Sequence, residues 1–312
     1  MSFELAWMRP EAPYMPIAIV GLLRALDDAG VPAAALWQRD GRGETLVLRT
    51  NASAERVAEA IINAPWPSLE RIWDGAIGQA IGPMLAAEAD PAEELRRLRA
   101  VVAERDRRAQ AAGEPRLLGE ARLLRALVTD AVLDDGGAPK RSRLLRGVKA
   151  DLSGIADAVP LNAGGLGAEL VDGPVWRAGK SGRGLGLVPE VQTFGGTTGR
   201  TPSDVGSHSA LLFRLLWLGI LAMPPIAVGR AGRLIVGGPL FTRAVNEDVV
   251  LSWPTWSFAV SWRGLTRLLT LEEVHAADEP ALAAHGLTTV HQTTSVPINN
   301  MIGAFRWGER VA

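Results

Sequence analysis

One segment of this 312-residue chain, from Ala210 to Val228, is far more apolar than the rest. A membrane-spanning helix needs about twenty consecutive apolar residues, and this segment is nearly long enough. However, Arg214 lies within it, Pro224 and Pro225 end a helix early, and the sequence contains no second segment of this kind. We therefore expect a helix buried in the protein core and no membrane contact. No secretion signal is evident, so we expect the cytoplasm.

The composition supports a large buried core. Hydrophobic residues make up 47% of the chain, which is enough for one large domain or two ordinary ones. The chain has no cysteine, which excludes disulfides and thiolate chemistry. Its four histidines leave little material for a zinc site. We expect no metal and no cofactor.

The first fifty residues predict a strand, a helix and a hairpin. An opening strand covers residues 3–8, and an apolar helix follows it and ends near Gly30. Two β-rich runs then flank a turn at residues 40–43. Ser53 is a good N-cap for the next helix, and Asp90-Pro91 is typical of the start of another.

The rest of the chain changes character twice. Residues 53–134 predict several helices separated by prolines, including one that runs from residue 116 to residue 133. Residues 161–209 are rich in glycine and lose periodicity. After the apolar helix come two core strands, a helix over residues 261–275 capped by Ser261, and a β-rich tail.

This order of elements favours an α+β fold over a doubly wound sheet, because strands and helices do not alternate regularly. The expected arrangement is an N-terminal strand-helix-hairpin, a central helical region, a glycine-rich loop region, and mixed C-terminal strands and helices. We expect two domains. Residues 1–160 would form an N-terminal α+β region with a helical insertion. Residues 161–312 would form the glycine-rich loops and a C-terminal α+β region.

A search for a catalytic site finds no constellation. The loop at Gly179-Lys180-Ser181 resembles a phosphate-binding P-loop, but Pro174 occupies the place of the leading glycine. Proline has no N–H to offer a phosphate. A nucleotide-dependent enzyme built on this loop remains the alternative function. The spacing of His275, His285 and His291 fits no helix face, so we expect ordinary core or surface roles for them.

Basic residues are concentrated in two places. Between Arg96 and Lys149 the chain has fourteen Lys and Arg against seven Asp and Glu, although the net charge of the whole chain is −1. Such residues either contact phosphates or are simply solvated charges beside a flexible loop, and the sequence allows both. The densest run and the glycine-rich region supply these candidates for a nucleic-acid surface: Lys140, Arg141, Arg143, Arg146, Lys149, Arg177, Lys180, Arg183 and Arg200.

Two stretches carry a resemblance to a known family. PYMPIAIVGLLRALDDAG, over residues 13–30, looks like the start of the large subunits of CRISPR-associated type I effector complexes (Cascade). Residues 213–238 and 249–269 resemble the C-terminal half of the short large subunit of subtype G, formerly called U. There an apolar helix, a basic glycine turn, and a strand with a Trp-Pro-x-Trp core follow one another. Trp253, Pro254 and Trp256 carry that core here. The opening at residues 8–10 departs from the family's usual start.

The resemblance implies a protein that is not an enzyme and has no catalytic residues. Its partners would be guide RNA, target DNA, other effector-complex subunits, and a helicase-nuclease recruited after target binding. It would read the protospacer-adjacent motif and help to open the duplex, while base pairing reads the target. Polar side chains in the glycine-rich region would touch base edges, with Asn162, Gln192, Thr197 and Thr198 as candidates.

Overall fold

The apolar segment forms a buried helix, α9 (Ala210–Ala222), as the sequence predicts. Ser209 caps it by accepting a hydrogen bond from the Leu212 N–H at 3.2 Å. None of the helices that the structure describes is long and apolar enough to cross a membrane. The structure is a computed structural model. It describes residues 2–41, 43–66, 91–129, 131–133, 139–141, 162–176, 209–223, 226–230, 233–237, 241–245, 248–299 and 302–312.

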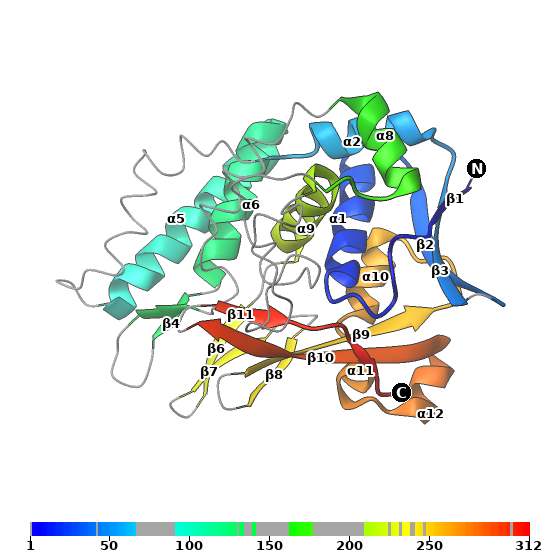
Figure 1. Ribbon diagram of the computed structural model, residues 1–312. Coiled ribbons are helices and arrows are strands. Elements are labelled where there is room, and N and C mark those ends of the chain that lie inside the picture. Colours follow the sequence, from blue (N-terminus) through cyan, green and yellow to red (C-terminus); the bar gives the residue numbers. More distant parts are fainter. Residues whose placement is uncertain are drawn as a thin grey trace.

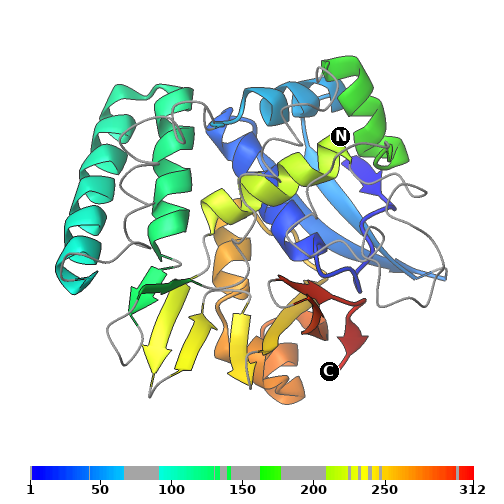
Figure 2. The same cartoon turned by 60° about the vertical axis from the view of Figure 1, so that its left-hand side comes forward.

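Helix α9 packs directly on α1 (Met15–Asp28), the apolar helix predicted near the N-terminus, and crosses it (Figures 1 and 2). Both helices have a glycine at the crossing. A methyl group on Gly21 would overlap the carbonyl of Leu215, and one on Gly219 would overlap the carbonyl of Ile17. The two backbones therefore approach more closely than any residue with a Cβ would allow.

A small antiparallel sheet lies beside α1. It contains β1 (Ser2–Leu5), β2 (Ala33–Asp40) and β3 (Gly43–Thr50), in the order β1-β3-β2. The predicted hairpin is confirmed, since Asp40 pairs with Gly43 at its tip. The opening strand is shorter than predicted. It ends at Leu5, because the Met8 N–H turns back to the Leu5 carbonyl at 2.9 Å.

Two of the predicted helix starts are confirmed in this region and the next. Ser53 caps α2 (Ala54–Asn63) by accepting from the Arg56 N–H at 3.2 Å. Helix α5 (Pro91–Ala112) begins at the predicted proline. A turn at Gly113, with φ of 65°, connects it to α6 (Pro115–Thr129), and the two helices pack together as an antiparallel pair.

The helix predicted to run to residue 133 ends four residues earlier. Residues 131–133 form β4 (Ala131–Leu133), which pairs with β5 (Pro139–Arg141) in a small antiparallel hairpin. Three consecutive apolar residues, Ala131, Val132 and Leu133, fit a strand as well as a helix, and pairing with β5 decides between them. Farther along the chain, α8 (Ala163–Asp172) contacts α2 and β1.

The C-terminal part is built on a second antiparallel sheet. Its main path runs β11-β10-β9-β8, and β12 pairs with β10. Strands β6 and β7 form a separate pair. The bounds of these strands are β6 (Ile226–Arg230), β7 (Arg233–Gly237), β8 (Phe241–Val245), β9 (Asp248–Trp256), β10 (Leu287–Asn299), β11 (Ile302–Phe305) and β12 (Glu309–Arg310).

The helix predicted over residues 261–275 is divided in two. Ser261 caps α10 (Trp262–Leu268) as predicted, accepting from the Gly264 N–H at 3.4 Å. The Thr270 N–H and hydroxyl then both bond to the Arg267 carbonyl, at 3.1 and 2.7 Å, which closes the last turn. Helices α11 (Glu272–Ala276) and α12 (Glu279–Ala284) follow and pack against β9 and β10.

All described strand pairs are antiparallel and are accompanied by helices, which confirms the α+β class. The boundary expected at residue 160 lies outside the described residues. Side chains from both sides of it share one hydrophobic core. Within that core the Trp253 indole donates to the Pro10 carbonyl at 2.7 Å, and the Trp256 indole donates to the Ala35 carbonyl at 2.8 Å.

Candidate nucleic-acid interface

The structure places the start of the densest basic run on β5. Lys140 pairs with Val132 and Arg141 pairs with Ala131 across the hairpin. Strand β4 in turn contacts α5, α6 and β6, so the hairpin lies where the helical pair meets the C-terminal strands (Figures 1 and 2). The backbone positions of Lys140 and Arg141 are therefore fixed by the hairpin, and as neighbours on a strand they belong to its opposite faces.

Asn162 has a structural role in the part of the chain that is described. Its Oδ1 accepts a hydrogen bond from the Gly165 N–H at 2.6 Å and caps α8. Helix α8 lies on the opposite side of the protein from β4 and β5 in both views (Figures 1 and 2). The structure therefore does not bring Asn162 together with Lys140 and Arg141.

The remaining candidates lie outside the described residues. This applies to both sequence regions that were singled out, the later part of the basic run and the glycine-rich region with its Gly179-Lys180-Ser181 loop. The residues concerned are Arg143, Arg146, Lys149, Arg177, Lys180, Arg183, Gln192, Thr197, Thr198 and Arg200.

The chain that leads into the Gly179-Lys180-Ser181 loop is described as far as Trp176. A P-loop follows a buried strand. Here the preceding element is α8, which ends at Asp172 and is followed by Gly173 with φ of 109°. The Glu169 carboxylate accepts from the Val175 N–H at 3.3 Å and holds the exit in place. This local structure differs from the strand-loop-helix arrangement that nucleotide binding uses.

Arg214 is a charged residue within the apolar helix α9, and it binds the C-terminal end of α2. Its Nε and Nη2 donate to the carbonyls of Ile61 and Ile62, at 2.9 and 2.6 Å, at the C-terminus of α2. Its guanidinium lies over the Trp66 ring at 4.4 Å. Burial lowers the pKa of Arg214 to about 10, so the group remains charged at neutral pH.

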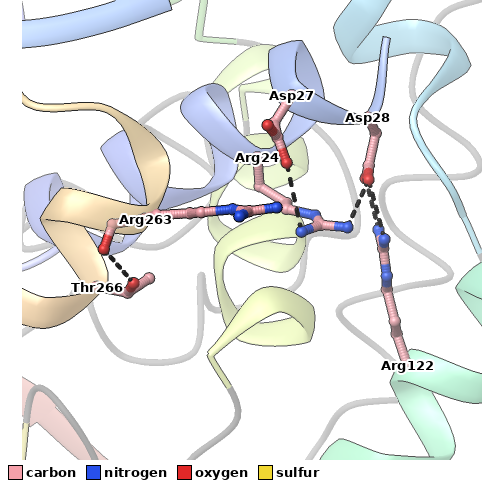
Figure 3. A network of polar contacts seen from close by, with 6 residues as sticks. All are labelled: Arg24, Asp27, Asp28, Arg122, Arg263 and Thr266. Carbon is pink, nitrogen blue, oxygen red and sulfur yellow. Dashed lines mark hydrogen bonds and ion pairs between the residues drawn. The ribbon is translucent and has the colours of Figure 1, made fainter. Parts of the chain in front are cut away.

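A second arginine network fixes the helical pair to the core, and sequence reasoning did not find it (Figure 3). Asp28 at the end of α1 accepts from Arg122 of α6 at 2.7 and 3.1 Å, and from Arg24 at 2.6 Å. The Arg24 guanidinium also lies over the Trp262 ring at 5.0 Å. In the sequence, Asp27 and Asp28 can be recognised only as the last turn of a helix. Arg122, the partner of Asp28, is 94 residues away, and a contact at that separation leaves no local pattern.

The three histidines that the structure describes have separate surroundings. His285 lies 3.9 Å from Glu273, whereas His291 stacks on Trp253 with ring centroids 6.0 Å apart. Burial and, to a smaller extent, the positive charge of Arg310 across the strand pair together lower the pKa of His291 to about 4. Burial also lowers the pKa of His275, while Glu272 raises it. Among the described residues, no group of three acidic, histidine or cysteine side chains could hold a metal ion.

Comparison with known proteins adds no assignment. No protein-family model matches the chain, and no curated protein sequence matches it. The described geometry offers two basic residues on a strand pair that contacts the helical pair and β6 through β4. Lys and Arg held in this way can contact a phosphate backbone.

Proposed function

We propose that this protein is a non-enzymatic large subunit of a CRISPR-associated type I effector complex, of the short form that it resembles in subtype G. In this proposal it binds target DNA, reads the protospacer-adjacent motif, helps to open the duplex and contacts the guide-RNA backbone. It acts in the cytoplasm together with other subunits, and a separate helicase-nuclease cleaves the target. Base pairing then supplies sequence specificity, and the protein supplies shape and backbone contacts.

One observation supports the proposal most. The stretches that carry the resemblance are about 200 residues apart in the chain, yet they pack into one unit. The helix with Gly21-Leu22-Leu23 crosses α9 at Gly219. The Trp-Pro-x-Trp strand donates from Trp253 to the Pro10 carbonyl, just before that helix. Both stretches are apolar and share one core, which is compatible with the single inherited fold that the resemblance implies.

The position of the basic residues is also compatible with this function. Lys140 and Arg141 lie on a strand pair outside the packed unit, and this strand pair contacts α5, α6 and β6 through β4. Phosphate contacts fix the register of a nucleic acid on a protein and need Lys and Arg on a shaped surface. The core elements that resemble the family would then hold the basic strand pair in position for binding.

The proposal is tested by the salt dependence of binding. Each phosphate neutralised in duplex DNA contributes about −0.9 to the slope of log K against log salt concentration. Charge reversal of Arg141, Arg143 and Arg146 to Glu should flatten the slope by roughly two to three units. Arg56→Glu is the matched control, since Arg56 is exposed on α2 and pairs with Glu59 at 2.8 Å. An unchanged slope in the triple variant would remove the basic run from the proposal.

Calorimetry with ATP and magnesium separates this proposal from the alternative of a nucleotide-dependent enzyme. The proposal expects no heat of binding at millimolar nucleotide. Saturable heat that disappears in Lys180→Ala would support the enzyme instead.

A further inference from the structure

Helix α10 lies beside an arginine network in which the acids are already engaged. Asp27 and Asp28, at the end of α1, lie 3.6 and 2.6 Å from the Arg24 guanidinium, and Asp28 also binds an arginine of α6. Helix α10 contacts α1, and its first residue, Trp262, lies under the Arg24 guanidinium at 5.0 Å. The next residue, Arg263, extends from α10 toward Arg24 (Figure 3). A further arginine therefore approaches a network that has no acid left for it.

Arg263 and Arg267 form one exposed side of α10. Both residues are exposed, and residues four apart lie on the same side of a helix. The opposite side is the one that packs, since Leu265 and Leu269 are fully buried. The two arginines are therefore carried by a helix that the core holds in place.

Neither of these arginines is compensated by an acid. In the part of the chain that the structure describes, Arg263 and Arg267 form no ion pair. Glu273, in the helix that follows α10, lies 3.9 Å from His285 instead. Like charges four residues apart on one helix repel each other, so the stability of α10 does not account for this pair. A bound anion would remove the repulsion.

We propose that Arg263 and Arg267 bind the phosphodiester backbone of a nucleic acid. This inference rests on the proposed function and adds a second contact surface to it, on the helix that follows the Trp-Pro-x-Trp strand. Four residues of helix rise by about 6 Å, so each arginine can hold a phosphate of its own. Arginine suits this contact because its planar fork binds phosphate oxygens through two N–H groups.

The charge favours a nucleic acid over an acidic protein as the ligand. An exposed pair between an arginine and a carboxylate contributes little to binding, because both groups are well solvated. A nucleic acid instead offers a continuous row of phosphates, and each phosphate that is neutralised releases condensed counterions. Two unpaired arginines on a fixed helix match that row.

The test compares two double variants of the full chain. Arg263→Gln with Arg267→Gln removes the charges and keeps the side-chain stems. Arg107→Gln with Arg108→Gln is the matched control, because both residues are exposed on α5 and already form ion pairs with Glu104. Binding is measured against salt concentration with a short DNA duplex, one of its single strands, and an RNA of the same sequence. We expect the α10 variant to flatten the slope by about one to two units on at least one probe, and the control to keep the wild-type slope.

A third variant, Arg263→Lys with Arg267→Lys, keeps both charges. It should retain the wild-type slope, because the slope counts neutralised phosphates, and bind more weakly, because lysine lacks the planar fork. If its slope flattened as much as that of the glutamine variant, the contact would not be one with phosphates, and the inference would fall.

The outcomes separate the inference from the function on which it rests. If the α10 glutamine variant keeps the wild-type slope while reversal of Arg141, Arg143 and Arg146 flattens it, the inference is wrong and the function stands. Equal flattening in the α5 control would also overturn it, because the effect would then be one of overall charge. An equal loss of binding to poly-glutamate would mean a surface for acidic proteins. If the wild-type protein binds none of the nucleic acids, both fail.

Discussion

Two regions of the molecule are stabilised by different kinds of contact. The core unit, which consists of α1, α9 and β9, is joined by apolar side chains, two glycines at a helix crossing, and indole hydrogen bonds. The helical pair of α5 and α6 docks on that unit partly through polar contacts. These include the Arg122–Asp28 ion pair and an Arg125 hydrogen bond to the Leu221 carbonyl at 3.5 Å.

The stretches that resemble the CRISPR-associated family lie mainly in the first of these regions, and the basic residues proposed for binding lie outside it. Residues 13–30 and the Trp-Pro-x-Trp strand belong to the core unit. The exposed arginines of α10 and the basic strand β5 lie outside it. We therefore expect changes in the core unit to act on the free energy of unfolding, and changes outside it to act on binding.

The largest effect on stability is expected for Gly219→Ala. The added methyl group would overlap the Ile17 backbone, so α1 and α9 must separate. We expect the free energy of unfolding to fall by about 3 kcal/mol or more, measured by denaturant titration. Gly164→Ala is the matched control, because that helical position on α8 has no close neighbour apart from Asn162 Oδ1 at 3.8 Å. A mild effect at Gly219 would contradict the close crossing.

Arg214→Leu should come next. Leucine preserves the apolar character of α9 but leaves the carbonyls of Ile61 and Ile62 without their donor. We expect a loss of about 2 to 3 kcal/mol in the free energy of unfolding, because buried carbonyls are then unsatisfied. If the variant were more stable than the wild type, the arginine would not be needed to bind the end of α2.

A third prediction concerns pH. Since burial lowers the pKa of His291 to about 4, the unfolded chain takes up a proton near pH 6.5 that the folded protein does not. The stability that neutral His291 contributes is complete above pH 6.5 and is lost as the pH falls toward 4. We expect about 1.5 kcal/mol of loss between pH 6.5 and about pH 5 from this group.

His291→Gln should remove that part of the pH dependence. His275, whose pKa burial also lowers, would keep its own contribution in the variant. The two proteins are compared by urea titration across this pH range. Parallel curves for wild type and variant would show that His291 is not the responsible group.

The smallest stability effect is expected at the junction of the two regions. Asp28→Asn weakens the ion pairs with Arg24 and Arg122, whose side chains are largely buried here, with Arg122 11% and Asp28 16% exposed. We expect a loss of about 1 kcal/mol, because the pair is only partly screened by water. Glu59→Gln, in an exposed pair on α2, should change stability by less than about 0.5 kcal/mol. An equal effect of the two substitutions would mean that the junction contributes no more than a surface pair.

Local signals in the sequence predicted much of the fold. The apolar segment, the proline at residue 91, and the serine caps at residues 53 and 261 act through neighbours in the chain, and the structure confirms each of them. The division at Thr270 and the strand at residues 131–133 were missed. The first depends on one hydroxyl and the second on a partner strand, and neither changes the hydrophobic pattern.

The candidate site was less accessible to prediction. Lys140 and Arg141 were chosen from charge density alone, whereas the position of their hairpin depends on the contacts of β4 with α5, α6 and β6. Asn162 was chosen as a polar side chain in a glycine-rich region, and the structure uses it as a helix cap. Arg122 and Arg214 find their partners across long sequence separations, which no local pattern encodes.

The nucleic acid that the protein carries in its own cells is the sharpest test of the proposed function. The chain is tagged, purified at low salt under native conditions, and its bound RNA is sequenced. We expect short RNAs of uniform length that contain CRISPR repeat sequence, recovered together with other effector-complex subunits. Recovery of the chain with no RNA, or with random fragments of abundant cellular RNAs, would contradict it.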